Sequence, residues 1–424
     1  MTPVSAEEEA DVLVFNTCSV RDQAERKALG KVQLMKRLKR RRPEIIIGVV
    51  GCMAQNYGEE LLKRVPHLDF VLGTDQLHCL PDVLAELETE RKQQCLTQAE
   101  PGLGAALNGH IAGTATAQVA VMRGCNQFCT YCIVPYVRGR EKSRPQRDIV
   151  AEVRKLSEQG VREVLLLGQN ITAYGVAEER RRDGRWSGAS HFADLLRQLD
   201  EVEGIERIRF TSPHVRFMTE DFIRAVVDLP SVCESLHVPL QSGSDRVLKA
   251  MHRGYTVREY RECLSRFREL CPDMTFSTDI IVGFPGESEE DFERTSEIMR
   301  DIGFDMSYIF RYSVRSGTQA EKLGDPVPDA VKDERNKRLL AELEAHTANS
   351  NNRYLGRSVD VLVEGPSKRN EHRWYGRTRT NKMCFFEPDA MSAAGTFRTV
   401  RVGRTTASSL FGELLPPNAA ADTI

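Results

Sequence analysis

The sequence predicts an α/β protein built from an N-terminal open parallel α/β domain, a central partial (β/α)6 barrel and a C-terminal small antiparallel β-barrel. Strand and helix patterns alternate over the first hundred residues, and they alternate about six more times in the middle of the chain. Short β-like runs separated by Gly, Pro and Asn then follow without helices. We place the domains at residues 1–100, 118–352 and 353–418, with a Gly-, Ala- and Thr-rich linker at 101–117.

Composition restricts the class of protein. The chain of 424 residues, 41% hydrophobic and 28% charged, is long enough for two or three soluble domains. It has no apolar run of the roughly eighteen residues that a membrane-spanning helix needs, and its N-terminus lacks the pattern of a signal peptide. We therefore expect a cytoplasmic protein with no membrane partner, whose cysteines serve metals or redox chemistry rather than disulfides. A net charge of −2 leaves nucleic-acid binding to local basic patches.

Two cysteines of the N-terminal domain follow predicted strands. Buried strands are expected at 11–16, 45–50 and 70–72, with helices at 21–42 and 77–91. Cys18 and Cys52 come just after the first and second strands. Because ligands of open α/β sheets lie at the carboxyl ends of strands, both thiols are expected on one edge. The alternative is that they are two ordinary core thiols.

The central region reads as repeated βα units. Its expected strands are 119–122, 163–167, 207–210, 235–238, 275–282 and 307–310. Its expected helices include 149–159, 192–199, 256–270 and 289–301, followed by an exit helix at 335–352. Such repeats predict a complete or partly open barrel, with functional loops at the carboxyl ends of the strands.

The loop after the first barrel strand contains Cys125, Cys129 and Cys132 in a C-x3-C-x2-C run, with Tyr131 just before the last cysteine. Three thiolates from one loop can hold three irons of a cubane cluster and leave the fourth iron open for a ligand. A structural zinc site is the alternative. It usually takes four ligands from two paired knuckles, and the sequence has no second C-x2-C and no H-x3-5-H pair.

Three further loops follow strands on the same predicted face, at residues 168–170, 239–244 and 283–287. Glycine and polar side chains at these positions suit the close approach of a polar ligand. Any one loop alone would be ordinary turn chemistry. Together with the cysteine loop, they predict cofactor contacts, with Gln169 and Asn170 among the candidates.

The C-terminal region is basic. Its expected strands are 358–364, 374–377, 383–386 and 397–402, and between residues 353 and 404 eleven Lys and Arg face five Asp and Glu. With Trp374, Tyr375, Phe385 and Phe386, such a barrel suits RNA, since cations contact phosphates and rings stack on bases. The alternative, which we favour for most of these rings, is that they fill the barrel core.

Several motifs together carry a resemblance, at residues 16–21, 51–53, 123–141, 168–175, 241–245 and 278–287. Over nearly its whole length the chain resembles the methylthiotransferase branch of the radical S-adenosylmethionine (SAM) superfamily, and most closely the MiaB-type tRNA methylthiotransferases. The resemblance implies a TRAM-like RNA-binding barrel at the C-terminus. It implies an enzyme that converts N6-isopentenyladenosine beside the tRNA anticodon to its 2-methylthio derivative. The implied partners are the tRNA anticodon loop and a flavodoxin- or ferredoxin-type electron donor.

The resemblance also implies site residues. Cys125, Cys129 and Cys132 would hold the 4Fe–4S cluster that binds SAM, with Tyr131, Gln169 and Asn170 as further cofactor contacts. Cys18 and Cys52 would be ligands of a second, auxiliary 4Fe–4S cluster. The family uses three cysteines there, and none of the 17 residues before Cys18 is a cysteine. We expect the natural start to lie upstream, and the chain as given to cleave SAM but to insert sulfur poorly.

Three alternatives remain. A sister methylthiotransferase would act on threonylcarbamoyl-adenosine in tRNA or on a ribosomal protein. A catalytically impaired tRNA-binding protein would bind RNA with normal salt dependence and give no methylthio product. A zinc-dependent RNA-binding protein would contain zinc and have no brown colour.

Overall fold

The computed structural model describes residues 2–19, 22–98, 113–416 and 421. The chain divides into two compact units, which are described separately below. The first unit comprises Met1–Leu107, Arg123–Glu141 and Ser313–Lys322, and the second comprises Asn108–Met122, Lys142–Tyr312 and Leu323–Ile424. Most of the predicted linker, residues 101–112, lies outside the described residues. Among the described residues, no helix is both long and apolar enough to span a bilayer.

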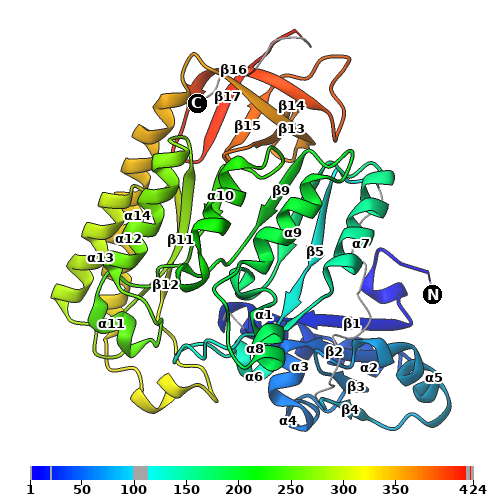
Figure 1. Cartoon of the computed structure of the whole chain (residues 1–424). Helices are drawn as coiled ribbons and strands as arrows, with labels where there is room; N and C mark the ends of the chain where they lie inside the picture. The colour runs from blue at the N-terminus through cyan, green and yellow to red at the C-terminus, as the bar shows by residue number, and fades with distance from the viewer. Residues whose placement is uncertain (1, 20–21, 99–112, 417–420, 422–424) are drawn as a thin grey trace. The chain divides into compact units, whose positions relative to one another are not determined.

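The first unit is built around a parallel sheet with the strand order β1-β2-β3-β4 (Figure 1). The strands are β1 (Val12–Thr17), β2 (Ile46–Gly51), β3 (Phe70–Leu72) and β4 (Gln94–Leu96). The helices are α1 (Asp22–Leu34), α2 (Lys36–Arg41), α3 (Cys52–Tyr57), α4 (Glu59–Arg64), α5 (Leu80–Glu90) and, in the cysteine loop, α6 (Val134–Val137). The predicted open parallel α/β domain is confirmed.

Both faces of this sheet are covered. All six residues of β2 are buried, so its side chains serve two cores. Ile47 and Val49 pack with α1, α3 and α4, whereas Ile46 and Val50 pack with α5. A parallel sheet covered on both faces exposes its carboxyl edge for ligands, which is where Cys18 and Cys52 follow β1 and β2.

The second unit contains two three-stranded parallel sheets among its described residues, β5-β8-β9 and β10-β11-β12. Parallel bridges from Ile208 to Val232 and from Thr211 to His237 join β9 to the β10 side. The strands are β5 (Thr116–Ala120), β8 (Glu163–Leu167), β9 (Arg207–Phe210), β10 (Ser235–His237), β11 (Thr275–Val282) and β12 (Met306–Arg311). Two short strands, β6 (Met122–Arg123) and β7 (Lys142–Ser143), pair with each other.

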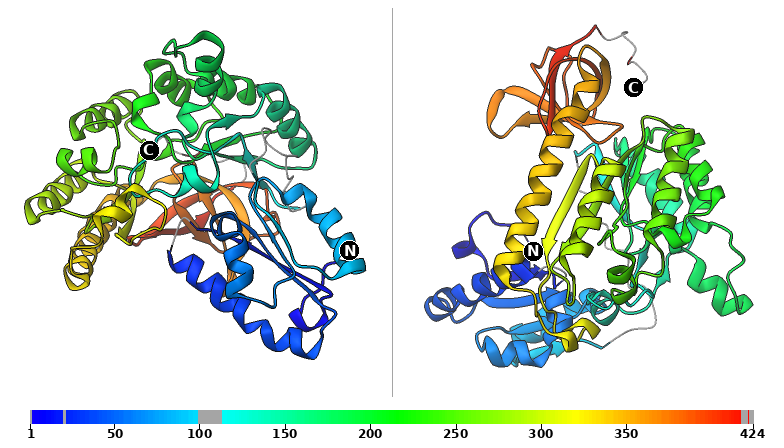
Figure 2. Two further views of the ribbon diagram at one scale, coloured as in Figure 1. Left: turned by 90° about the horizontal axis from the view of Figure 1, so that it is seen from below. Right: turned by 90° about the vertical axis from the view of Figure 1, so that its left-hand side faces the viewer.

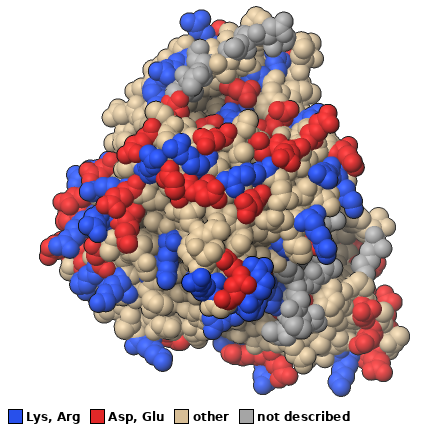
Figure 3. All heavy atoms as spheres, viewed as in Figure 1, with Lys and Arg blue, Asp and Glu red and all other residues tan. Residues whose placement is uncertain are grey.

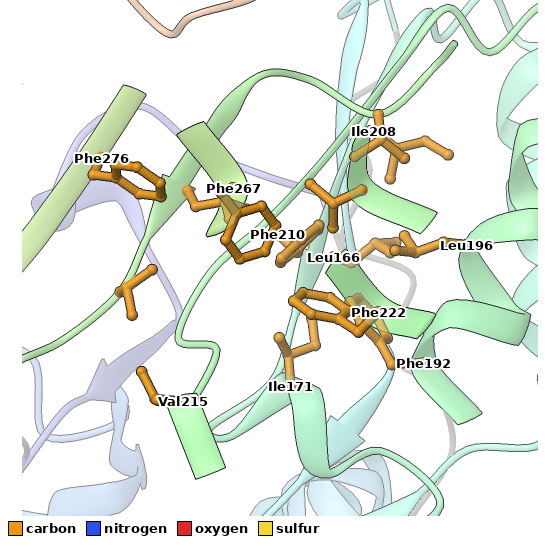
Figure 4. Close-up of a cluster of buried hydrophobic side chains, with 14 of the residues drawn as sticks. Leu166, Ile171, Phe192, Leu196, Ile208, Phe210, Val215, Phe222, Phe267 and Phe276 are labelled. Atoms are coloured by element: carbon orange, nitrogen blue, oxygen red, sulfur yellow. The ribbon is translucent and has the colours of Figure 1, made fainter. Parts of the chain in front are cut away.

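Helices cover one face of these strands. They are α7 (Gln146–Glu158), α9 (His191–Asp200), α10 (Glu220–Asp228), α11 (Asp245–Ala250), α12 (Val257–Leu270), α13 (Glu289–Ile302) and α14 (Asp329–Asn351). A further helix, α8 (Val176–Asp183), packs with Ala173 and Phe217 in a separate cluster. Aromatic rings from strands and helices meet in the core beneath the covering helices, where Phe192 and Phe210 lie edge to face at 5.1 Å and Phe222 packs beside them (Figure 4). Helices on one side only leave the other face of the strands available, as the predicted partial barrel requires.

The C-terminal strands close into a barrel with the order β13-β14-β15-β17-β16. The strands are β13 (Ser358–Ser367), β14 (Asn370–Thr378), β15 (Met383–Phe386), β16 (Phe397–Thr405) and β17 (Ser409–Leu414). The pairs are antiparallel except β15 with β17, which is parallel. Val361, Cys384, Phe386 and Leu410 are among the residues that fill the core.

Buried arginines fasten this barrel to the amino ends of the central strands. Arg207 of β9 donates to the backbone oxygen of Arg377 at 2.6 Å and to the Asp360 carboxylate at 2.7 Å. Arg209 donates to the backbone oxygens of Thr378 and Arg379. The long helix α14 leads into the barrel (Figure 2). Within the second unit, the C-terminal barrel therefore sits at the end of the strands opposite to the loops after β8, β10 and β11.

Candidate active site

A reciprocal pair closes the base of the cysteine loop. The Glu141 carboxylate accepts hydrogen bonds from the backbone N and the Nδ2 of Asn126, both at 3.1 Å, and Glu141 N donates to Asn126 Oδ1 at 3.3 Å. Cys125 N donates to Gly139 O at 3.1 Å across the same opening. Because the Glu141 side chain is buried, these bonds are protected from water and hold the two ends of the loop together.

Two backbone positions inside the loop are strained or restricted. Gly124 has a φ of 79°, and a Cβ there would lie 2.2 Å from Arg140 O, so only glycine fits. Phe128 has a φ of 48°, an unusual conformation for a bulky residue. Its ring lies under the Arg140 guanidinium at 4.3 Å and edge-on to Tyr136 at 5.9 Å. Strain of this kind persists where the surroundings enforce it, commonly at functional sites.

The three cysteines of the loop lie within electrostatic reach of one another. The pKa of the Cys125 thiol is raised to about 12, mainly by burial and in smaller part by the charges of Glu141, Cys129 and Cys132. Among the described residues, no group of three or more acidic, His or Cys side chains surrounds a single ion position. A cubane cluster needs a different arrangement, with one thiolate per iron, and three thiols of one closed loop supply it. The donor set therefore fits an iron–sulfur cluster.

Cys18 and Cys52 lie next to each other at the sheet edge. Their preceding residues Thr17 and Gly51 are register partners on β1 and β2, and neighbouring parallel strands lie about 5 Å apart. Cys18 is exposed, whereas Cys52 is 3% exposed. Two thiols at one carboxyl edge, as the sequence predicted, fit two ligands of a second cluster. A 4Fe–4S cluster needs further ligation beyond these two.

The cysteine loop packs on this sheet edge within the first unit. Cys52 lies in one apolar cluster with Ile133 and Val137, and Arg138 Nε donates to Cys52 Sγ at 3.4 Å. Thr74 Oγ1 donates to Val137 O at 2.9 Å. Arg123 pairs with Asp75 and donates to Thr74 O at 3.2 Å. The structure thus places both predicted cysteine groups in one compact unit.

Gln169 and Asn170 belong to the second unit, in the loop after β8. Gln169 and the loop residue Tyr131 are half-buried. Asn170 is buried, and its Oδ1 accepts a hydrogen bond from Thr172 Oγ1 at 3.3 Å. Its Nδ2 has no hydrogen-bond partner among the described residues. Because a buried unpaired donor is costly, this amide fits a site that a polar ligand completes.

Side chains of α13 hold the loop after β10 in place. Gln241 has a φ of 77°, Gly243 N donates to Thr295 Oγ1 at 2.9 Å, and Ser244 Oγ donates to Asp291 Oδ1 at 2.6 Å. A Cβ on Gly243 would lie 2.5 Å from Arg294 O. The predicted ligand loop is therefore rigid and close to α13, which fixes where its backbone points.

The inner face of the central strands carries polar side chains that our sequence analysis did not identify. His237 of β10 contacts Ser277 and Asp279 of β11 through its two ring nitrogens. Tyr308 of β12 lies edge-on to the His237 ring at 5.9 Å. The available signal was a polar residue at every second position of otherwise apolar strands, which marks the face that does not pack on helices.

The C-terminal barrel exposes fewer cations than the eleven that the sequence contains in this region. Five of its eleven cations pair with carboxylates: Arg353, Arg377, Arg379, Lys382 and Arg398. Six are exposed: Arg357, Lys368, Arg369, Arg373, Arg401 and Arg404. Over the face seen in Figure 3, cations and anions are interspersed. Local clusters, rather than a field of the whole molecule, must supply any attraction for RNA.

The rings of this barrel divide between core and surface. Phe386 lies in the core and Trp374 packs against it, so the core position that we expected for most of the four predicted rings holds for two of them. Tyr375 and Phe385 face outward, where Phe411 completes a row across β14, β15 and β17. Phe385 and Phe411 stack at 5.3 Å, and the Arg404 guanidinium lies 3.7 Å above the Phe411 ring. Half-buried rings next to cations suit stacking on bases.

Family models match three stretches of the chain. Residues 119–299 match the radical SAM superfamily, residues 1–73 match the uncharacterized protein family UPF0004, and residues 352–415 match the TRAM domain. A curated protein of Opitutus terrae named tRNA-2-methylthio-N(6)-dimethylallyladenosine synthase is 43% identical over 97% of this chain and 91% of its own length. The chain belongs to the tRNA-2-methylthio-N(6)-dimethylallyladenosine synthase family.

Other members of this synthase family agree. The Syntrophus aciditrophicus protein of that name is 43% identical over 96% of this chain and 87% of its own, and that of Akkermansia muciniphila is 42% identical over 98% and 93%. Among solved structures, the radical SAM methyltransferase TsrM of Kitasatospora setae matches with a TM-score of 0.53 over 71% of this chain and 63% of its own. At 14% identity that likeness bears on the fold alone. The predicted family and fold class are confirmed.

Proposed function

We propose that the chain is a radical SAM methylthiotransferase that converts N6-isopentenyladenosine, next to the tRNA anticodon, to its 2-methylthio derivative. The observation that carries this proposal is the 43% identity over 97% of the chain to a curated synthase of that name. The closed three-cysteine loop supports it from the chemistry of the site. We further propose that the reaction takes place in the cytoplasm, where thiols remain reduced.

In this proposal Cys125, Cys129 and Cys132 hold the SAM-binding 4Fe–4S cluster. With its clusters and SAM bound, such a site supplies one-electron cleavage of SAM and sulfur for the adenine C2 position. The chain's own part is to bind, to orient and to exclude water. The Asn126–Glu141 pair keeps the loop closed. Tyr131, Gln169 and the Nδ2 of Asn170, for which the described part of the chain offers no partner, are proposed to contact SAM.

Cys18 and Cys52 are proposed as two ligands of the auxiliary cluster. Their side-by-side position after β1 and β2 supports this role, and the Arg138 contact orients the Cys52 sulfur. A flavodoxin- or ferredoxin-type protein is the proposed electron donor. Iron analysis tests the arrangement, because roughly four irons per chain would mean one cluster and roughly eight would mean two.

The C-terminal barrel is proposed to bind the anticodon arm of tRNA. Six exposed cations support phosphate contacts, and the outward row of Tyr375, Phe385 and Phe411 supports stacking on unpaired bases. The proposed domain limits are 1–100, 118–352 and 353–418, with the linker at 101–117. Family matches within each of the three domains support them.

Nucleoside analysis tests the proposed function directly. The anaerobically reconstituted protein is incubated with SAM, a reductant and tRNA that carries either N6-isopentenyladenosine or threonylcarbamoyl-adenosine. We expect mass spectrometry of the digested RNA to show a methylthio group on the isopentenyl nucleoside only. A methylthio group on the threonylcarbamoyl nucleoside instead would favour the sister enzyme, and product on neither RNA would contradict the proposal.

A further inference from the structure

Five residues of the sheet β10-β11-β12 lie on its inner face, which is the face that the helices do not cover. The register pairs His237 with Ser277, Ser277 with Met306, and Asp279 with Tyr308. Side chains paired across neighbouring strands point to the same face. Residues next to them in sequence pack instead in the helix-covered core: Leu236, Val238, Phe276 and Ile280. The two faces of β10 and β11 are thus chemically distinct, with a polar and partly aromatic inner wall.

The polar half of this wall is fixed in position. His237 Nδ1 lies 3.0 Å from Ser277 Oγ, and His237 Nε2 lies 3.3 Å from Asp279 Oδ2. The imidazole therefore cannot rotate without losing two contacts. The Asp279 side chain is 25% exposed, so its carboxylate can accept a further hydrogen bond from a ligand N–H or O–H group.

The apolar half lies on β12, the edge strand of its sheet (Figure 1). Tyr308 and Phe310 stack nearly parallel, with ring centroids 6.3 Å apart and an angle of 19°. Tyr308 is 44% exposed and Met306, two residues earlier on the same face, is 38% exposed. Large apolar side chains left exposed side by side are typical of binding surfaces rather than of a packed core.

We propose that this wall, formed by His237, Asp279, Met306, Tyr308 and Phe310, binds the isopentenyl-adenine base of the substrate RNA. The purine would stack on Tyr308, and Asp279 would accept the N–H that an N6-substituted adenine retains. Met306 and Phe310 would contact the five-carbon isopentenyl group. A carboxylate on the wall disfavours phosphate, so a base suits the wall better than the RNA backbone does. This inference rests on the proposed function and adds the place where the base is held.

Base binding at this wall agrees with the position of the modified nucleoside in a loop. Enzymes that act on a nucleobase take it out of the stack and hold it between aromatic or apolar side chains and hydrogen-bonding groups. An unpaired loop base costs little to splay out. The wall offers both kinds of group on three adjacent strands, all within one unit of the chain.

The test compares two anticodon stem–loop RNAs that differ only by the isopentenyl group on one adenosine. Their dissociation constants are measured by fluorescence anisotropy with the anaerobically reconstituted full chain. We expect the wild-type protein to bind the isopentenyl RNA more tightly. Tyr308→Ala should weaken the binding of both RNAs roughly tenfold, the order expected for the loss of one stack between a base and a ring. Tyr308→Phe retains the ring and should bind with the wild-type affinity. Met306→Glu should reduce the ratio of the two affinities, because a charge replaces the apolar contact that the isopentenyl RNA alone would make.

Leu340→Ala is the matched control, since Leu340 is 45% exposed on α14 and outside the wall. It should change neither affinity, and thermal unfolding of each variant checks its fold. The proposed site is overturned if the wild type ignores the isopentenyl group, or if folded Tyr308→Ala and Met306→Glu bind both RNAs as the wild type does. A wild type that prefers the isopentenyl RNA yet forms no methylthio product contradicts the proposed function while retaining this site.

Discussion

Arg138 donates a hydrogen bond from its Nε to the sulfur of Cys52 at 3.4 Å, although the two residues are 86 positions apart in the chain. Arg138 follows α6 in the loop that carries Cys125, Cys129 and Cys132, and Cys52 is the buried one of the two proposed auxiliary ligands. A hydrogen bond from a fixed N–H group orients a sulfur atom, as outer groups orient the ligands of metal sites. The loop of one proposed cluster thereby positions a proposed ligand of the other.

Loss of this contact should weaken the auxiliary site. We expect Arg138→Ala to lower the apparent affinity for iron at that site about 10- to 100-fold, the usual effect of removing a group that orients a metal ligand. Iron and sulfide per chain after treatment with increasing chelator measure the effect. Arg147→Ala removes an exposed arginine of α7 that pairs with its neighbour Asp148, and serves as the control. Equal iron retention by both variants would show that the Arg138 contact has no role in the cluster.

The outward face of the C-terminal barrel should bind RNA through two contributions, charge and stacking, that different substitutions remove. Arg404→Ala should reduce the slope of log affinity against log salt concentration by roughly 0.7 if it meets one phosphate of unpaired RNA. Phe411→Ala should weaken binding by about 1–3 kcal/mol with little change in slope, because a stack is lost and no charge. Filter binding of tRNA across a salt series measures both.

The control for this pair is Arg294→Ala on α13, which removes a cation that is paired with Glu290. It should leave both the affinity and the salt slope near the wild-type values. If Arg404→Ala keeps the wild-type salt slope and Phe411→Ala keeps the wild-type affinity, RNA does not bind to this face of the barrel.

Arg207 should contribute strongly to the attachment of the C-terminal barrel. Its side chain is 1% exposed, and its guanidinium bonds to Arg377 O and to both the backbone and the carboxylate of Asp360. We expect Arg207→Ala to lower the free energy of unfolding by about 3 kcal/mol, because buried acceptors lose their donor. Urea unfolding measures this loss, and limited proteolysis should cut more readily near residue 355.

The exposed pair of Arg224 with Glu220 provides the comparison for this prediction. Arg224→Ala should cost less than about 1 kcal/mol, as is usual for surface ion pairs. Similar small losses for Arg207→Ala and Arg224→Ala would mean that the barrel is held mainly by other contacts.

Acid should destabilise the loop after β10 through Asp291. Burial raises the pKa of this carboxyl, but hydrogen bonds from Arg246, Ser244 and Ser288 outweigh burial and hold the pKa below its ordinary value. A lowered folded-state pKa gives stability that is complete above the unfolded value near 4 and is lost as pH falls below it. At pH 7 we expect Asp291→Asn to be roughly 2 kcal/mol less stable than the wild type.

This difference should shrink as pH falls below about 4, because the carboxyl then takes up a proton in the unfolded wild type while the folded state still holds it ionised. Urea unfolding at neutral and acid pH measures it. A stability gap that is independent of pH would show that Asp291 acts through shape rather than through its charge.

Much of the fold followed from local pattern. The strands at 163–167, 207–210 and 275–282 were predicted with the limits of β8, β9 and β11, because each is an uninterrupted β-rich run between turn residues. Cys18 and Cys52 were placed correctly at one edge, since parallel strands bring their carboxyl ends together. The strands β4 and β17 were missed because both are short or interrupted by glycine and charge.

The parts of the site that the sequence did not reveal depend on long-range pairing. His237 and Asp279 meet only because β10 lies beside β11. The count of basic residues after 353 could not show that Lys382 pairs with Asp305 or Arg379 with Glu234, since both carboxylates lie far upstream. Strand alternation decides which rings face outward, and that required the register of the barrel.

The most direct test of the central claim is SAM cleavage by the reduced protein. Anaerobically reconstituted wild type and Cys129→Ala are incubated with SAM and dithionite, and 5′-deoxyadenosine is quantified by mass spectrometry. Cys271→Ala, which removes a half-buried cysteine outside both proposed cluster sites, is the control. We expect 5′-deoxyadenosine from the wild type and from Cys271→Ala, and none above background from Cys129→Ala. Equal amounts from Cys129→Ala and the wild type would contradict the assignment of this loop as the radical SAM site.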